Sequence, residues 1–346
     1  MMKKRFDIDF LREQSVRVLV QNGANEQDAR IVVDSMLEAD INGVTTHGIR
    51  MIYSYVHKLK KGDFSLSIPQ ILKSTPAYTI LDGNNTMGAV AAMKAVNICK
   101  EKAKKHGIHT VFARNCNTFG PGFYYAEKIA ASGMVGFVCC NSPAAMPAYN
   151  GLEPMLGTNP LAFACPSKSK GTIALDMATS IVAKSRFETA RLNGDILPVG
   201  WAVDKNGKPT TDPIEAIKGF VLPMAGFKGY GIAMIIDILS GVMSGSGYLN
   251  KVNKFYSQDG KGMNVGQLFV AFDPEQIYDG DFLSDMDEYI DLLRNSKTVD
   301  GKQIAIPGDD RAKVKEMSQK HGVTLSADSV DKLEQTFGTQ LKEVIC

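Results

Sequence analysis

The segment TTHGIR, residues 45–50, is the first stretch of this chain whose side chains could take part in a reaction. We expect His47 near the start of a helix, where Thr45 or Thr46 can cap the helix N-terminus. In the alternative interpretation, His47 donates a proton and Arg50 binds an anion. The residues leave both possibilities open, because a histidine beside a helix end has structural and catalytic uses.

Two segments in the middle of the chain carry short polar side chains, GTNPLAFACP (157–166) and DMATS (176–180). Thr158, Asn159, Thr179 and Ser180 fall at expected strand ends, where convergent polar groups can orient a ligand in an apolar cleft. Asn-Pro pairs and clustered hydroxyls also mark ordinary turns. The pattern by itself therefore leaves a turn and a ligand site open.

Two glycine-containing segments lead into helices, AGFKGYG (225–231) and AIPGDDRAKV (305–314). In the first, glycines surround Lys228, and such a backbone at a helix N-terminus can hold a phosphate with the lysine as a point charge. In the second, Asp309 and Asp310 suit the helix dipole, with a ligand role as the alternative. Neither segment is a Walker A loop or a Rossmann fingerprint.

Composition excludes several classes of partner. The 346 residues carry 39 basic and 37 acidic side chains, a formal net charge of +2, which gives no overall field for nucleic acid or anionic lipid. The sequence shows neither a signal peptide nor an apolar run of the roughly 20 residues that a membrane span needs. We therefore expect a cytoplasmic protein with no nucleic-acid or membrane partner.

No motif in the sequence indicates a metalloenzyme or a hydrolase. The sequence contains neither the His-Glu-x-x-His nor the Gly-x-Ser-x-Gly pattern, and the six cysteines form no Cys-x-x-Cys pair. We expect no metal site and no disulfide framework, with most of the cysteines serving as small hydrophobic side chains.

The elements that position these segments follow from hydrophobic periodicity. Helical patterns cover 7–23 and 25–44, and a third helix is expected from Thr46 through Leu59. Strand patterns cover 77–83, 108–115, 134–141, 161–166 and 172–178, with helices over 88–107 and 122–133. Further amphipathic helices are expected within 310–322 and 326–345. Central strands with flanking helices predict an α+β fold with a helical partner domain.

The segment 232–245, IAMIIDILSGVMSG, is apolar on almost every side of a helix. Surface helices show a polar face, so this pattern predicts a helix buried within or between domains.

Five segments together resemble the malate/L-lactate dehydrogenase family, which is unrelated to the Rossmann-type enzymes: ADINGVTTHGIR, GTNPLAFACP, LDMATS, GWAVDKNGKPTTDP and GFKGYGIAMIIDILSGVMSG. They occur in order between about residue 10 and about residue 320. The resemblance implies a non-Rossmann cofactor-binding domain with a mixed sheet, over 76–231. It also implies a helical domain built from both chain ends, 1–75 with 232–346, and a homodimer.

The resemblance also implies roles for individual residues. His47 is the expected proton donor and Thr118 lies in the catalytic loop, while Thr46, Arg50, Tyr55 and Asn117 are expected to contact the substrate. The residues implied to contact the cofactor are Asn159, Asp176, Met177, Ala178, Thr179, Ser180, Lys184, Phe227, Lys228, Gly229, Gly308, Asp309 and Asp310.

Two positions depart from the family pattern. Many members have a histidine where this chain has Thr118, and members usually have an arginine, four residues after the first histidine, where this chain has Met51. Arg50, three residues after His47, would share a side of a helix with it, although each residue turns the helix by about 100°. Both departures weaken the usual pattern for 2-oxo acids.

Three hypotheses follow for the activity. The first is hydride transfer from NAD(P)H to a small carbonyl compound, a 2-oxo acid or close analogue, with His47 as proton donor. The second keeps the scaffold and takes a cyclic imine, whose protonated form already carries the proton that a ketone must receive. The third is a nicotinamide-binding regulatory protein without catalytic activity.

The choice of cofactor is open between NAD and NADP. Lys184 and Arg186 follow the DMATS segment, where some family members hold the adenosine 2′-phosphate, and this cationic pair favours NADPH. The alternative is a solvated helix face.

Overall fold

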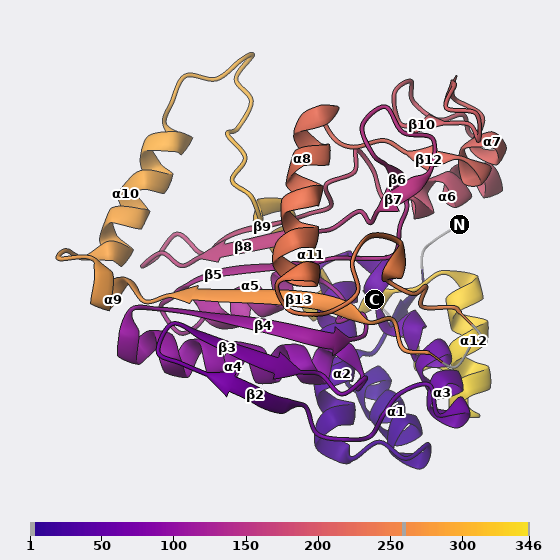
Figure 1. Ribbon diagram of the computed structural model, residues 1–346, viewed down its shortest axis with the longest axis horizontal. Coiled ribbons are helices and arrows are strands. Elements are labelled where there is room, and N and C mark those ends of the chain that lie inside the picture. Colours follow the sequence, from indigo (N-terminus) through magenta and orange to yellow (C-terminus); the bar gives the residue numbers. More distant parts are fainter. Residues whose placement is uncertain (1–3, 258–260, 345–346) are drawn as a thin grey trace.

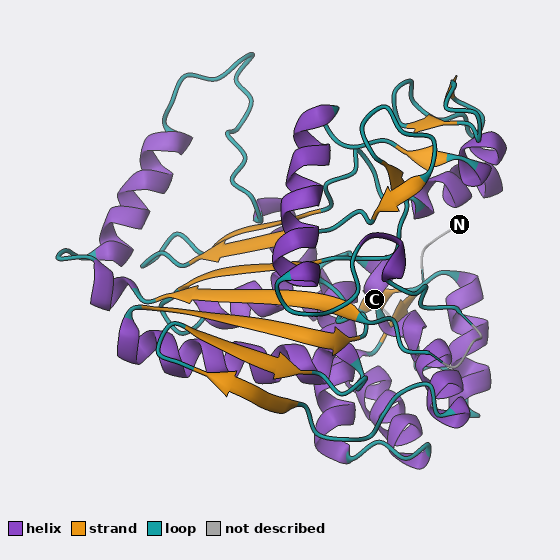
Figure 2. Cartoon of the chain, in the orientation of Figure 1, coloured by secondary structure: helices purple, strands orange, loops and turns teal. Residues whose placement is uncertain are grey.

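A seven-stranded mixed sheet runs through the centre of the computed structural model, which describes residues 4–257 and 261–344 (Figures 1 and 2). Its order is β2-β3-β4-β13-β5-β8-β9. Strands β3 and β4 are parallel, and the other neighbouring pairs are antiparallel. The strands are β2 (Gln70–Ser74), β3 (Tyr78–Asp82), β4 (Ile108–Cys116), β13 (Val265–Phe272), β5 (Val135–Cys140), β8 (Leu161–Cys165) and β9 (Ile173–Met177).

Alternating side chains give the sheet two buried faces. Val111, Phe269 and their neighbours belong to the core that includes α4 (Gly88–His106) and α5 (Gly122–Ala130). Leu268 precedes Phe269 on β13, so its side chain points to the opposite face of the sheet. It belongs to a second cluster with Ile236 of α8 (Phe227–Ile236). Because successive side chains of a strand point to opposite faces, helices cover the sheet on both sides. The predicted α+β fold with a mixed sheet is confirmed.

The central strand β13 comes from a part of the chain that the sequence did not mark as a strand. It lies between β4 and β5, although 232–346 was assigned to the helical domain. Most of its residues are buried, so VGQLFVAF shows no polar alternation, and a short apolar run does not distinguish strand from helix. The division into 1–75 with 232–346 and 76–231 stays a prediction, and the sheet crosses it.

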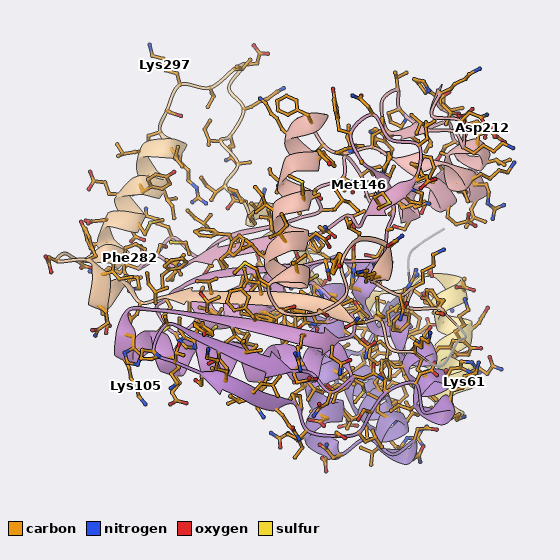
Figure 3. The ribbon with its side chains drawn as sticks, viewed as in Figure 1. Lys61, Lys105, Met146, Asp212, Phe282 and Lys297 are labelled. Carbon is orange, nitrogen blue, oxygen red and sulfur yellow. The ribbon has the colours of Figure 1, made fainter. Side chains whose placement is uncertain are left out.

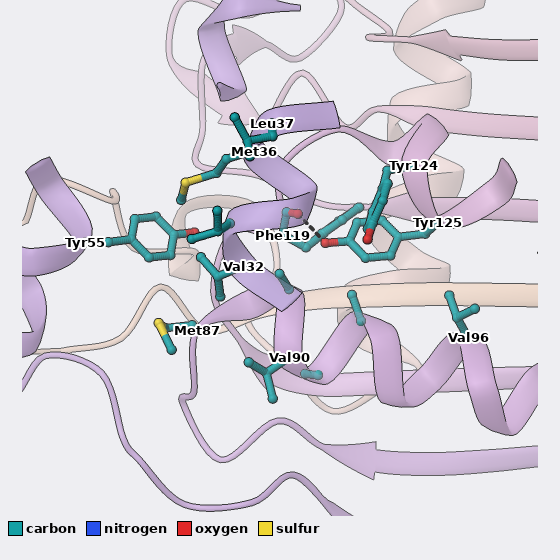
Figure 4. Close-up of a cluster of buried hydrophobic side chains, with 14 of the residues drawn as sticks. Val32, Met36, Leu37, Tyr55, Met87, Val90, Val96, Phe119, Tyr124 and Tyr125 are labelled. Carbon is teal, nitrogen blue, oxygen red and sulfur yellow. Dashed lines mark hydrogen bonds between the residues drawn. The ribbon is translucent and has the colours of Figure 1, made fainter. Parts of the chain in front are cut away.

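Helices from both chain ends pack at one end of the sheet (Figure 1). They are α1 (Ile8–Gln21), α2 (Glu26–Ile41), α3 (Ile52–Lys61), α11 (Asp309–His321) and α12 (Ala327–Phe337). The two chain ends meet because β1 (Arg5–Phe6) pairs with β14 (Val323–Thr324). Figure 4 shows Val32 and Met36 of α2 facing Tyr55 of α3 and Met87 near the start of α4. The helical part built from both ends is therefore present.

A smaller lobe has its own core around Met146 and Phe187. It contains β6 (Met146–Pro147), β7 (Pro154–Leu156), β10 (Ala202–Val203), β11 (Pro209–Thr210), β12 (Phe220–Val221), α6 (Ser185–Asn193) and α7 (Pro213–Lys218). On the opposite side, α9 (Pro274–Ile277) and α10 (Phe282–Arg294) lead into a loop that projects from the body, where Figure 3 labels Phe282 and Lys297.

Two helix predictions need correction. The helix expected from Thr46 begins only at Ile52, after two short 3-10 turns. The apolar stretch 232–245 forms the end of α8 and a π-helical turn, Asp237–Val242, but is not buried on all sides. Ile235 and Val242 are 55% and 50% exposed, because the sheet covers one side of the helix and leaves the other uncovered within one chain.

The described residues hold free, buried thiols at Cys99, Cys116, Cys139, Cys140 and Cys165, in agreement with a packing role. No helix among them is long and apolar enough to cross a membrane. Within the same residues, no three His, Cys, Asp or Glu side chains gather as a metal site would require.

Candidate active site

His47 lies on the 3-10 turn Thr45–His47, which Gly48 separates from a second turn, Ile49–Met51. Gly48 is extended, with φ −80° and ψ −169°, so His47 and Arg50 share no helical face. A Cβ atom at Gly48 would lie 1.9 Å from Oδ1 of Asp40. The turn that carries His47 therefore depends on a glycine packed directly against a carboxyl group.

The carboxyl group of Asp40, in α2, is buried beneath this turn. Its Oδ2 accepts a hydrogen bond from the backbone N–H of Ile49 at 2.6 Å. Burial raises the pKa of Asp40 to about 7, while the Ile49 hydrogen bond and the charge of Arg50 act in the opposite direction. Sequence reasoning gave Asp40 no role, because an acidic residue in a helix usually faces solvent.

A small pocket brings together three of the predicted residues, His47, Tyr55 and Thr118, from separate segments. The remaining lining residues are Val32, Ser35, Met36, Met51, Ala89, Phe119 and Gly120. The pocket forms where the turn after α2, helix α3 and the loop before α5 meet. These segments are far apart in the chain, so the sequence alone does not show that their residues lie together.

Tyr55 fixes the loop that carries Thr118. Its buried hydroxyl donates a hydrogen bond to the backbone oxygen of Thr118 at 3.2 Å. Burial raises the pKa of Tyr55, so the phenol stays protonated. The Thr118 hydroxyl is no acid or base near neutral pH. Among the described lining residues, His47 is therefore the group suited to exchange a proton.

The imidazole of His47 lies at the exposed rim of the pocket. Its Nδ1 is 3.0 Å from Oγ1 of Thr46, which leaves Nε2 as the nitrogen able to face a ligand. The protein atoms around the ring, and then the charge of Arg50, lower the pKa of His47. Water at the rim moderates this effect, and the direction favours the neutral imidazole.

Arg50 does not line the pocket, and Met51 does. The Arg50 side chain is exposed, which follows from the extended backbone at Gly48. The hydroxyl of Tyr256 donates to the sulfur of Met51 at 3.8 Å. Sequence reasoning missed Tyr256, which is 205 residues away from Met51.

Two predicted contact residues, Asn117 and Asn159, are buried and bonded within the protein. Asn117 donates from Nδ2 to the backbone oxygen of Thr86 at 2.8 Å, and its Oδ1 accepts from the N–H of Met263 at 3.0 Å. Asn159 donates from Nδ2 to the oxygen of Ala233 at 2.9 Å. Both amides hold neighbouring segments in place.

Asn159 also supports Ser142, a residue that sequence reasoning missed. Oδ1 of Asn159 accepts a hydrogen bond from the backbone N–H of Ser142 at 3.0 Å. The Ser142 hydroxyl is buried and finds no hydrogen-bond partner among the described residues. A buried polar atom without a partner is costly, so this hydroxyl is suited to meet a bound ligand.

The predicted cofactor segments 176–180 and 227–229 lie side by side. The N–H of Met224 donates to the oxygen of Thr179 at 2.9 Å, and Ser180 forms a β-bridge with Pro223. Gly229 packs so closely that a Cβ atom there would lie 2.3 Å from the Met224 oxygen. The end of β9 therefore meets the start of α8. Met177 and Ala178 lie on the β9 side, and Phe227 and Lys228 are exposed on the α8 side.

Asp176 links the cofactor segment to the pocket loop. Its Oδ2 accepts a hydrogen bond from the N–H of Phe123 at 3.0 Å, five residues after Thr118. Burial raises the pKa of Asp176, and the Phe123 hydrogen bond and the charge of Arg311 oppose this rise.

Arg311, in α11, is a second residue that the sequence did not reveal. Its Nη2 donates to the oxygen of Ala174 at 2.7 Å and lies 3.4 Å from Oε1 of Glu127. Its guanidinium carbon is 4.5 Å from the centre of the Phe123 ring. In an amphipathic helix with many charges, the sequence gave no signal that one arginine faces inward.

The predicted segment 308–310 lies against β9. Ala174 donates its N–H to the oxygen of Pro307 at 2.8 Å, and Gly308 has φ +109°. Asp309, the first residue of α11, accepts from the N–H of Ile306 at 2.9 Å, in the loop before the helix, while Asp310 is exposed. The segment is thus close to Asp176, two residues along β9 from Ala174.

Lys184 is exposed, just before α6, and donates to the oxygen of Gly219 at 3.4 Å. The surrounding protein and then the charge of Lys254 lower its pKa. Lys254, from a distant part of the chain, is a further cation at this place.

Comparison with known proteins identifies relatives over nearly the whole chain. Residues 6–334 match the model of the malate/L-lactate dehydrogenase family. The malate/(S)-sulfolactate dehydrogenase of Methanothermus fervidus is 35% identical over 327 residues, 94% of each chain. The sulfolactate dehydrogenase structure from Methanocaldococcus jannaschii has a TM-score of 0.90 at 34% identity, over 97% of this chain and 98% of that one.

A reductase of another substrate class has the same fold. The structure of Δ1-piperideine-2-carboxylate reductase from Pseudomonas syringae has a TM-score of 0.87 at 25% identity, over 96% of this chain and 99% of that one. With a family model matched over most of its length and relatives above one third identity, this chain is an oxidoreductase that belongs to the malate/L-lactate dehydrogenase family.

Proposed function

We propose that this enzyme transfers hydride between NAD(P)H and the carbonyl carbon of a small 2-oxo acid or close analogue, with His47 as the proton donor. The observation that carries the proposal is the shared pocket of His47, Tyr55 and Thr118. Asp176 ties the loop of that pocket to the segment expected to contact the cofactor. Proton exchange and hydride transfer need this proximity.

The residues present fit a nicotinamide cofactor. Ser142 offers a buried hydroxyl that lacks a partner among the described residues, and the open space beside Gly226 allows close approach to the backbone at the start of α8. Lys228 is exposed beside that helix N-terminus, a place suited to a phosphate. When bound, the nicotinamide supplies or accepts the hydride.

His47 accounts for the proton. In reduction, the carbonyl carbon gains hydride and its oxygen gains a proton from Nε2 of a protonated His47. In the reverse reaction, the neutral imidazole takes the hydroxyl proton. Thr46 fixes the ring through Nδ1, and the lowered pKa of His47 suits the acceptor role near neutral pH.

NADPH is the favoured cofactor in this proposal. Lys184 and Lys254 place two cations near each other, as expected of a site for the additional phosphate. We further propose that the protein is cytoplasmic and that it is a homodimer. The uncovered apolar side of α8 and the projecting α10 arm support the dimer.

A cyclic imine is the second candidate substrate. Thr118 cannot protonate a ligand, and His47 favours its neutral form, so the pocket is a weak acid near neutral pH. An iminium already carries the proton that a ketone must acquire. The likeness to a piperideine-carboxylate reductase supports the same candidate.

The test combines a substrate panel with one substitution. NAD(P)H consumption is followed with 2-oxo acids and with cyclic imines, and His47→Ala should lower turnover of the best substrate at least about 100-fold while the cofactor still binds. The matched control is His57→Ala, an exposed histidine on α3 that does not line the pocket. Near-normal turnover by His47→Ala contradicts the proton role, and cofactor binding without any turnover indicates the inactive binding protein.

A further inference from the structure

The backbone that carries His47 is held by few hydrogen bonds of its own. The N–H of His47 donates to the oxygen of Val44 at 3.1 Å. The N–H of Gly48 donates to the oxygen of Thr45 at 3.3 Å. The turn Thr45–His47 has no side-chain cap, and 3-10 turns have poorer hydrogen-bond geometry than an α-helix. A contact from another element is therefore needed to fix the direction of the His47 ring.

The carboxyl group of Asp40, from α2, makes such a contact. Asp40 is only 5% exposed, and its Oδ2 accepts from the N–H of Ile49, two residues after His47, at 2.6 Å. A Cβ atom at Gly48 would lie 1.9 Å from Oδ1, 2.3 Å from Cγ and 2.4 Å from Oδ2. The whole carboxyl group therefore packs on the residue that follows His47, and its hydrogen bond is strengthened by burial away from water.

Gly48 provides space at this contact rather than backbone freedom. Its φ of −80° and ψ of −169° are extended angles that any residue adopts. A side chain at this position would instead overlap the carboxyl group of Asp40, which belongs to a helix of 16 residues. The contact thus anchors a short turn to a long helix.

Asp40 has two routes by which to act on His47, its charge and the backbone between them. The pKa of His47 is lowered by burial and then by the charge of Arg50, while the contacts of Asp40 are made with the backbone. We propose that Asp40 is a positioning residue, which fixes the backbone after His47 and so holds its ring where a proton can pass to or from the substrate. This inference rests on the proposed function, since Asp40 acts through His47.

The first test compares two substitutions of Asp40 in single turnovers with the best substrate of the panel. Asp40→Ala should slow the reaction at least about tenfold at an unchanged cofactor affinity, because small displacements of a reacting group cost large factors in rate. Asp40→Asn keeps an acceptor for Ile49 and should stay within about threefold of the unaltered enzyme. Asp34→Ala, on the same helix with a side chain 46% exposed, is the control and should keep the rate. An Asn variant as slow as the Ala variant would show that Asp40 acts by its charge, and overturns the inference.

The second test asks whether Asp40 acts through His47. In a chain that already carries His47→Ala, adding Asp40→Ala should slow the remaining turnover by less than about twofold, because the group that Asp40 positions is gone. An equal loss in both backgrounds would show general damage to the fold and contradicts the inference.

Gly48→Ala disturbs the same contact from the other side and decides the question if Asp40→Ala does not fold. Its Cβ atom must displace the turn or the carboxyl group, so the single-turnover rate should fall at least about tenfold at an unchanged cofactor affinity. In the His47→Ala background the same change should cost less than about twofold. An unchanged rate for Gly48→Ala, or an equal loss in both backgrounds, overturns the inference.

The outcomes separate this inference from the proposed function. Near-normal turnover by His47→Ala refutes the proton role of His47, and the inference with it. Slow turnover by His47→Ala together with a normal rate for Asp40→Ala refutes only the inference.

Discussion

At the scale of single residues, the pKa values of two titratable groups on either side of Gly48 shift so that each favours its neutral form. Burial raises the pKa of Asp40 to about 7, and the surrounding protein lowers that of His47. The cause is common, since burial disfavours the charged form of an acid and of a base alike. Near neutral pH, the turn therefore holds a partly protonated Asp40 beneath a mostly neutral His47.

Asp40 makes stability depend on pH. The folded chain binds the Asp40 proton more tightly than the unfolded chain between pH 3.8 and about 7, so its contribution to stability falls as pH rises through this window. The fall is at most about 1.4 kcal/mol for each pH unit. Asp40→Asn removes the titration and can still accept from Ile49, so its free energy of unfolding should rise relative to the unaltered chain as pH rises.

Chemical denaturation at a series of pH values measures this difference. The control is Asp331→Asn, an exposed carboxylate on α12, whose difference from the unaltered chain should be the same throughout the window. Parallel pH curves for Asp40→Asn and the unaltered chain would show that Asp40 does not titrate there.

At the scale of elements, one arginine joins three parts of the site. From α11, Arg311 reaches β9 at Ala174, α5 at Glu127 and the ring of Phe123. Asp176 of β9 in turn holds the N–H of Phe123. The loop with Thr118 and the segment expected to bind the cofactor are therefore fixed relative to each other.

Replacing Arg311 should weaken this connection. Arg311→Met removes a charged hydrogen bond and an ion pair from a partly buried position, so unfolding free energy should fall by roughly 1 to 3 kcal/mol. Cofactor affinity should fall as well, because β9 loses its tie to α11. Denaturation and a cofactor titration measure the two effects.

Lys313→Met, an exposed change on the same helix, is the matched control and should alter stability by less than about 0.5 kcal/mol. If Arg311→Met lost stability but bound the cofactor as tightly as this control, Arg311 would support the fold without positioning the site.

At the scale of the whole molecule, one group of exposed apolar side chains lies along α8 and the π-helical turn. Met234, Ile235, Ile238, Val242 and Met243 are all exposed there. Tyr289 and Leu292 are exposed on α10, which projects from the body (Figure 1). Apolar surface concentrated in this way is typical of an interface between subunits.

We predict that the protein is a dimer in solution, with this side of α8 in the interface. The double substitution Ile235→Glu with Val242→Glu should convert the dimer to single chains, because unpaired carboxylates would be buried on association. Light scattering during gel filtration measures the mass. Ile196→Glu, an exposed position in the smaller lobe, should leave the dimer intact, and a single-chain mass for the unaltered protein would contradict the prediction.

Much of the fold followed from local patterns. The helices α1, α2, α4 and α5 and the strands β3, β4, β5, β8 and β9 lie where periodicity and turn residues predicted them. The sequence pattern did not predict the strand β13, since burial on both faces removes the polar alternation that identifies a strand. The third helix began late because Gly48 is extended over Asp40, a contact between residues that are eight positions apart.

The sequence by itself determined most of the element types and the family, because periodicity and motifs depend on residues near one another in the chain. It also showed that Thr118 and Met51 depart from the family pattern. The tertiary structure alone decided that Met51 faces the pocket while Arg50 does not, and that Tyr256 and Arg311 reach the site from 205 and 137 residues away. Such contacts, and the burial that shifts the pKa of Asp40, arise only when distant segments pack together and exclude water.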